Sequence, residues 1–152
     1  MKILLYTISK SLPLEPIYTH YKKLCRGFGA EIVCKNIFNR EIVIAQKTNP
    51  KSAQESYTKA LNPLLLQHQA NNIALHKEGR SLDSAAFANL LAQRSKVAFF
   101  IGGAFGFEEK FLAKTTPISL SPLTFSHTIV GIIVLEQIYR SLSILAHHPY
   151  HK

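Results

Sequence analysis

Short apolar runs alternate with helical segments along this chain, and this alternation limits the folds that the chain can adopt. Mostly apolar runs occupy residues 2–8, 31–38, 72–76, 97–101 and 117–120. Segments with helical spacing lie between them, as in Leu14, Ile17, Tyr18, Tyr21 and Leu24. Strands that alternate with helices predict an α/β domain with a mostly parallel sheet flanked by helices.

Capping and turn residues predict where the helices begin and end. Ser11 and Pro13 indicate the start of a first helix, which Gly27 and Gly29 end. Further helices are expected at 51–62, from Asp83 or Ser84 to Arg94, at 108–114 and at 127–145. The polar and basic stretch 39–50 is interpreted as a loop, and 79–81 as a turn.

The length and composition favour a single soluble domain spanning residues 1–152. Hydrophobic residues make up 47% and charged residues 18%, which excludes disorder, collagen and a coiled coil. The apolar segment at the N-terminus, residues 1–6, is too short for a signal peptide. The longest uncharged stretch, 115–135, contains Pro117, Pro122 and His127. That stretch is a poor membrane span, so we expect a cytoplasmic protein without a membrane partner.

The two cysteines do not form a recognisable chemical motif. Eight residues separate Cys25 from Cys34, which fits neither a redox C-x-x-C pair nor half of a zinc site. We expect small buried hydrophobic residues in a reducing compartment.

The charge is strongly positive. Eighteen Lys and Arg residues against nine Asp and Glu residues give a net charge of +9. Ten of the bases and four of the acids lie in residues 1–60, so this part carries most of the excess. A small protein this basic attracts polyanions, so by charge alone RNA, DNA and an anionic membrane surface all suit it as partners.

Two loops follow consecutive expected strands. The first contains Gly102, Gly103 and Gly106, in a G-G-x-x-G spacing that fits neither a dinucleotide-binding fingerprint nor a P-loop. The second is 120–125, with apolar residues and two hydroxyls. Ligands of open α/β sheets bind at the carboxyl ends of strands, so the two loops together predict one cleft.

The last helix and the tail carry the remaining candidate groups. His127 opens the helix, and Glu136 and Arg140 have the spacing of an ion pair. The tail contains three histidines around Tyr150, but no Cys or Asp lies nearby, so we predict no metal site. Its imidazole, phenol and ammonium groups suit a nucleic-acid base and its phosphate.

These C-terminal phrases are the residues that identify a family. Glu136-Gln137-Ile138-Tyr139-Arg140 and His148-Pro149-Tyr150-His151-Lys152 follow the Gly102 loop and the phrase 120–125 in the expected order. In these phrases the chain resembles the RlmH family, the 23S rRNA pseudouridine N3-methyltransferases of the SPOUT superfamily. The resemblance covers essentially the whole chain and is specific from about residue 75 onward.

The resemblance implies a fold, a cofactor and partners. It implies a SPOUT-type domain with a C-terminal trefoil knot, which forms a homodimer and binds S-adenosyl-L-methionine. The implied reaction is methylation of N3 of a pseudouridine in a 23S rRNA hairpin loop, on assembled ribosomes, without a metal. Alternatives are a SPOUT protein that acts on another RNA position and a catalytically inactive, basic RNA-binding protein.

The candidate site residues fall into three groups, of which the cofactor contacts are carried over by motif from the resemblance and the others are chosen by their chemistry. The cofactor contacts are Leu75, Gly102, Leu120, Ser121, Pro122, Leu123, Thr124 and Phe125. The catalytic candidates are His127, Arg140, Tyr150 and His151, with the general base unassigned. The RNA-binding candidates are His148, Tyr150 and Lys152.

The chain departs from the family pattern at a few positions. Ala104-Phe105 stands where family members usually carry Pro-Glu, and Ser126 replaces a usual proline. Gly131 stands where they commonly carry Arg. The last helix also has more apolar surface than its own core needs, which predicts a dimer contact through Ile129, Ile132, Ile133, Val134, Leu135 and Ile138.

Overall fold

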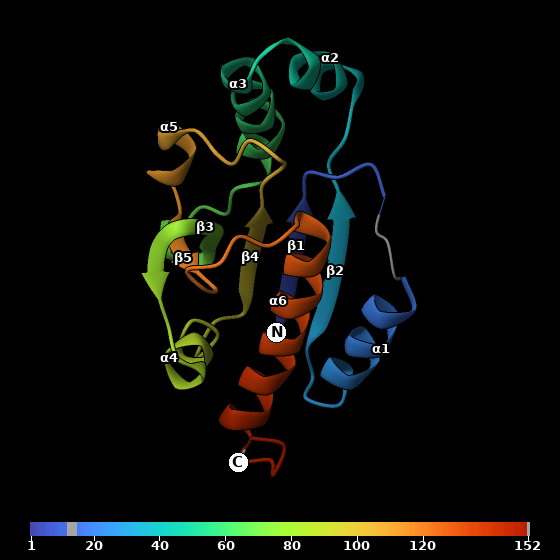
Figure 1. Cartoon of the computed structure of the whole chain (residues 1–152). Helices are drawn as coiled ribbons and strands as arrows, with labels where there is room; N and C mark the ends of the chain where they lie inside the picture. The colour runs from blue at the N-terminus through green and yellow to red at the C-terminus, as the bar shows by residue number, and fades with distance from the viewer. Residues whose placement is uncertain (12–14, 152) are drawn as a thin grey trace.

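Five strands form one parallel sheet in the order β2-β1-β4-β3-β5 (Figure 1). The computed structural model of the protein describes residues 1–11 and 15–151. The strands are β1 (Lys2–Thr7), β2 (Glu31–Asn36), β3 (Asn72–Ser81), β4 (Lys96–Ile101) and β5 (Thr116–Ser119). The predicted α/β architecture with a parallel sheet is confirmed.

Helices cover both faces of this sheet. They are α1 (Glu15–Arg26), α2 (Arg40–Thr48), α3 (Pro50–Leu61), α4 (Ser84–Asn89), α5 (Glu109–Leu112) and α6 (His127–Leu145). Alternate side chains of β1 point to opposite faces, so Ile3 and Leu5 pack with α1, α4 and α6, whereas Leu4 and Tyr6 pack with α2, α3 and α5. Figure 1 shows α6 lying across the sheet between α1 and α4.

The helix α6 has the predicted bounds and is a core helix. By length and composition it could cross a membrane. However, Val134, Leu135 and Ile138 are fully buried in the core that α6 shares with β1 and β4. The apolar character of α6 therefore serves the packing of the sheet.

The expected loop at 39–50 is wrong, because most of it forms α2. The Asn39 side-chain oxygen accepts a hydrogen bond from the Ile42 amide at 2.9 Å and so caps this helix. Asn49 then caps α3 by accepting from the Ser52 amide at 2.8 Å, with Pro50 as the first helical residue. The predicted helix at 51–62 is thus confirmed with a slightly earlier start.

The expected turn at 79–81 is also wrong, because β3 continues to Ser81. After an irregularity beyond Leu75, Arg80 and Ser81 pair with Ile118 and Ser119 of β5. A Cβ on Gly79 would lie 2.6 Å from the Ile118 backbone, so glycine here permits the close approach of two strands.

Several helix ends differ from expectation. The helix α4 is capped by Asp83 as predicted but ends at Asn89 rather than Arg94. The helix α5 spans Glu109–Leu112, which is shorter than 108–114. The predicted start at Pro13 lies outside the described residues, and α1 is described from Glu15.

Candidate functional site

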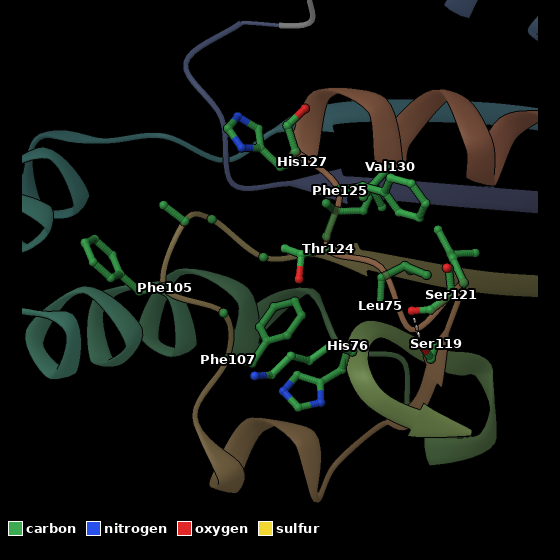
Figure 2. Close-up of a pocket in the computed structure, with 18 of the residues that line it drawn as sticks. Leu75, His76, Phe105, Phe107, Ser119, Ser121, Thr124, Phe125, His127 and Val130 are labelled. Carbon is green, nitrogen blue, oxygen red and sulfur yellow. Dashed lines mark hydrogen bonds between the residues drawn. The ribbon is translucent and has the colours of Figure 1, made fainter. Parts of the chain in front are cut away.

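A cleft of about 750 Å³ opens at the carboxyl edge of the sheet, beyond the ends of β4 and β5 and beside the irregularity in β3 (Figure 2). Its walls come from Leu75 and His76 of β3, the loop 101–107, the segment 119–127, Val130 of α6 and Gln54 of α3. The structure therefore brings the two predicted loops into one cleft, because parallel strands release their following loops at the same edge.

The glycine loop is shaped by packing as well as by access to the cleft. Gly106 has φ +70°, and its amide donates to the Gly103 carbonyl at 3.0 Å. A Cβ on Gly103 would lie 2.7 Å from the Tyr57 hydroxyl. Gln54 anchors the loop to α3 by donating to the Phe105 carbonyl at 2.8 Å. Gly102 lines the cleft, and a Cβ there would lie 3.3 Å from the Phe107 ring.

The second loop is braced by its own hydroxyls. The Ser119 hydroxyl donates to the Ser121 carbonyl at 3.0 Å, and the Ser121 hydroxyl accepts from the Leu123 amide at 3.0 Å. Figure 2 shows Thr124 reaching into the cleft and Phe125 beside Val130. Seven of the eight predicted cofactor residues line the cleft, and Pro122 is not among the lining residues.

The charged groups of the cleft are all basic or imidazole. Among the described lining residues these are His76, Lys77 and His127, with no carboxylate. The backbone amide of Glu78 approaches Nδ1 of His76 at 3.4 Å. Sequence reasoning missed His76 and Lys77, although both directly follow Leu75 near the cleft edge. The Lys77 ammonium and the imidazole of His76 supply a positive charge and a ring N–H group, which suit a ligand that carries a carboxylate or a phosphate.

The other predicted catalytic residues lie toward the opposite end of α6. Glu136 accepts from Nη2 of Arg140 at 2.6 Å and from the Tyr150 hydroxyl at 3.1 Å. The hydrogen bond between Arg140 and Glu136 raises the pKa of the Arg140 guanidinium. Burial is the largest cause that raises the pKa of Tyr150, and the Glu136 carboxylate is the next. The Glu136–Arg140 ion pair predicted from spacing is confirmed.

Within one chain the candidates therefore form two groups. His127 lines the cleft, whereas Arg140 lies thirteen residues further along α6, which is about 20 Å at the rise of a helix. Tyr150 and His151 follow in the exposed tail, with His148, and Lys152 lies outside the described residues. Among residues 1–11 and 15–151, no three His, Cys, Asp or Glu side chains cluster to hold a metal.

Comparisons with known proteins point in one direction. A family model described as a predicted SPOUT methyltransferase matches residues 1–151. A ribosomal RNA large subunit methyltransferase H of Helicobacter acinonychis is 46% identical over 152 residues, which is all of both chains. One of the same name from Helicobacter hepaticus is 42% identical over 153 residues, again covering both chains in full.

A solved structure shares the fold. The structure of a probable methylase family protein from Haemophilus influenzae aligns with a TM-score of 0.54 and 10% identity. The alignment covers 99% of this chain and 70% of that chain. At this identity the likeness concerns the architecture alone.

Proposed function

Because this chain belongs to the SPOUT methyltransferase family, we propose that it methylates ribosomal RNA of the large subunit, with S-adenosylmethionine as the methyl donor. The finer proposal is that the acceptor is N3 of a pseudouridine in a 23S rRNA hairpin loop, on assembled ribosomes in the cytoplasm. The observation that carries the methyltransferase proposal is the cleft that the Gly102 loop and the segment 119–127 build together, and the acceptor nucleotide rests on the family phrases.

The residues of the cleft fit this cofactor. Its volume lies in the range of small-molecule sites, and it combines apolar walls with exposed loop backbone. Leu75, Leu120 and Phe125 would enclose the adenine, and the backbone of 120–125 would supply donors and acceptors for its edge. The Lys77 ammonium would balance the carboxylate of the methionine part, and His76 and His127 would offer hydrogen-bonding groups beside it.

The cofactor supplies an electrophilic methyl group on a sulfonium, and the protein must place a base nitrogen in line with it. The N3 proton of the base must also leave, because a neutral imide nitrogen is a poor nucleophile. His127 is the catalytic candidate that lines the cleft. Arg140, Tyr150 and His151 would stabilise the anion that forms on the base or take part in the proton transfer.

These groups can meet only if two chains build one site. In a single chain, about 20 Å of α6 separates His127 from Arg140. We therefore propose a homodimer in which the tail of one protomer reaches the cleft of its partner. Exposed Leu123 and Ile129, at 69% and 49%, mark the apolar surface available for that contact.

The apolar surface that we propose for this contact is smaller than the one expected from sequence. Val134, Leu135 and Ile138 are fully buried in the chain's own core and cannot also face a partner. Ile132 and Ile133 are half-buried. Sedimentation should give twice the chain mass, and Ile129→Lys should shift it toward the monomer and lower methyl transfer. A monomer that methylates at full rate would exclude this arrangement.

The family resemblance also implies the trefoil knot, which we infer for the C-terminal segment. Among the alternative functions, the Gly131 that stands where relatives commonly carry Arg makes an inactive RNA-binding protein the one to weigh. Gly131 is buried, and its Cβ position faces the hydroxyl of Tyr18 in the core. Gly131 does not line the cleft, and its Cβ position faces Tyr18, so the enzyme remains our proposal.

Calorimetry with S-adenosylmethionine tests the cofactor site. Gly102→Val should weaken binding at least about tenfold, because the new methyl groups occupy the cleft beside Phe107. Ala85→Val, at an exposed alanine of α4, is the matched control and should bind as wild type does. Equal affinity in Gly102→Val would remove this loop from the site.

Methyl transfer and nucleoside mass spectrometry test the substrate. Tritiated methyl groups should enter 23S rRNA of assembled ribosomes far faster than naked rRNA, and the product should be a methylated pseudouridine. Deletion of residues 148–152 should abolish transfer and leave cofactor binding intact. Preference for naked RNA, or a different modified nucleoside, would favour a SPOUT enzyme that acts on another position.

A further inference from the structure

The carboxylate of Glu136 holds together two side chains that are distant in sequence. Its Oε1 accepts from Nε of Arg140 at 3.1 Å, from Nη2 of Arg140 at 2.6 Å and from the Tyr150 hydroxyl at 3.1 Å. Its Oε2 accepts from Gln137 at 2.6 Å. The Glu136 and Arg140 side chains are only 21% and 27% exposed, so water screens this pair less than an open surface pair.

The backbone after α6 directs the tail back onto the helix. His147 adopts φ +53°, and the His148 amide donates to the Ser143 carbonyl at 2.8 Å, as in a Schellman motif. The turned tail then packs on aromatic rings. The ring centroids of His148 and Phe28 lie 5.6 Å apart, and those of Tyr150 and Tyr139 lie 4.6 Å apart in an edge-on contact.

The Tyr150 ring is thereby held from more than one side. The Arg140 guanidinium carbon lies 4.9 Å from the ring centroid, a cation–π distance. The Tyr150 hydroxyl donates a hydrogen bond to Glu136. Because the hydroxyl hydrogen bonds Glu136, the phenol oxygen can still accept a hydrogen bond from an N–H group through its lone pairs. Glu136 bonds Nε and Nη2 of Arg140, which leaves Nη1 for another acceptor.

We propose that Glu136 is a positioning residue of the methyl-transfer site, which fixes the Tyr150 phenol and the Arg140 guanidinium as one preorganised pair that the tail presents to the RNA base. This inference rests on the proposed function. The phenol oxygen accepts a hydrogen bond from an imino N–H of the base, and the guanidinium faces a carbonyl or phosphate oxygen. Without the carboxylate, both side chains must be ordered anew at each encounter.

Methyl transfer by variants of Glu136 tests the catalytic consequence. Glu136→Gln keeps the shape but removes the charge, so kcat should fall about tenfold to a hundredfold, with unchanged affinity for S-adenosylmethionine. Glu136→Asp retains the charge with a shorter reach and should fall between. Glu55→Gln, at an exposed site on α3, makes the same change in net charge and should act as wild type does.

A double-mutant cycle separates positioning from a general effect on the fold. If Glu136 acts through Tyr150, then Glu136→Gln should cost much less in a Tyr150→Phe background than in wild type. Additive losses, or a kcat for Glu136→Gln within about twofold of wild type, would overturn the proposal. Unchanged circular dichroism melting curves would show that the variants fold.

A readout that needs no activity comes from the Tyr150 phenol. Carbon-13-labelled tyrosine resolves its signal by NMR, and Tyr150→Phe assigns it. The titratable or charged groups around it are Glu136, Arg140, Tyr21, Tyr139 and His148. In wild type the pKa of Tyr150 should exceed the ordinary value, and Glu136→Gln should lower it.

The NMR titration and the methyl-transfer assay test the positioning role and the proposed function independently. An unchanged Tyr150 pKa in Glu136→Gln would overturn the positioning role even if the enzyme methylates RNA. Conversely, a lowered pKa in a protein that methylates no RNA would refute the proposed function and, with it, the role in methyl transfer, while leaving the contact between Glu136 and Tyr150 established.

Discussion

At the level of single residues, the absence of a side chain at Gly131 leaves room in the core for the hydroxyl of Tyr18. A Cβ at this position would overlap the hydroxyl of Tyr18, which is 2% exposed. Gly131→Ala should therefore lower the free energy of unfolding by about 1–3 kcal/mol, despite the higher helix propensity of alanine. Urea denaturation of the two proteins measures the difference.

Tyr18→Phe provides the control for this overlap. Removing the hydroxyl opens the space that the new methyl group needs, so Gly131→Ala should cost less in the Tyr18→Phe background. An equal cost in both backgrounds would show that the overlap is relieved elsewhere.

At the scale of the element, α2 depends on the residue that precedes it. The Asn39 side chain supplies the acceptor for the Ile42 amide, and Ile42 is fully buried against α3 and the sheet. Asn39→Ala should destabilise the protein by about 1 kcal/mol, whereas Asn39→Asp keeps the acceptor and should cost little. Thermal melting of both variants tests this, and a smaller loss for Asn39→Ala than for Asn39→Asp would contradict the capping role.

At the scale of the whole molecule, buried neutral groups make stability depend on alkaline pH. Burial raises the pKa of Cys25 to about 12, of Cys34 to about 11 and of Tyr18 to about 12. The unfolded chain loses these protons near the ordinary values of 9.0 and 10.0, before the folded chain does. The free energy of unfolding should thus be fully retained below about pH 9 and fall as pH rises toward 12.

Urea titrations at a series of pH values measure that decline. Cys34→Ala removes one of the groups and should make the slope above pH 9 shallower, without changing its sign. A free energy of unfolding that rises between pH 9 and 11 would contradict the assignment of burial as the cause.

The net charge of +9 also acts at this scale. Contacts of Lys and Arg with phosphates release counterions, so binding to ribosomal RNA should weaken steeply and linearly on a logarithmic salt scale. Filter binding between about 50 and 200 mM salt measures the slope. An affinity independent of salt would mean that phosphate contacts are not the main source of binding.

The features predicted correctly from the amino-acid sequence are local or periodic. The period of the apolar residues predicted the strands and α6, because each pattern repeats within a few turns or residues. The parallel sheet followed from their alternation, and it placed the loops at Gly102 and 120–125 at one edge. The family phrases added the proposed cofactor and substrate, which no pattern of burial contains.

Only the tertiary structure decided which surfaces meet. The extension of β3 past Leu75 depends on pairing with β5, about forty residues later, and so escaped a local interpretation of Gly79. The same packing placed His76 and Lys77 at the cleft, buried Leu135 and Ile138 inside the chain, and held the tail at the far end of α6 from His127. Contacts between distant segments depend on side-chain volume and hydrogen bonding in three dimensions, which sequence spacing does not encode.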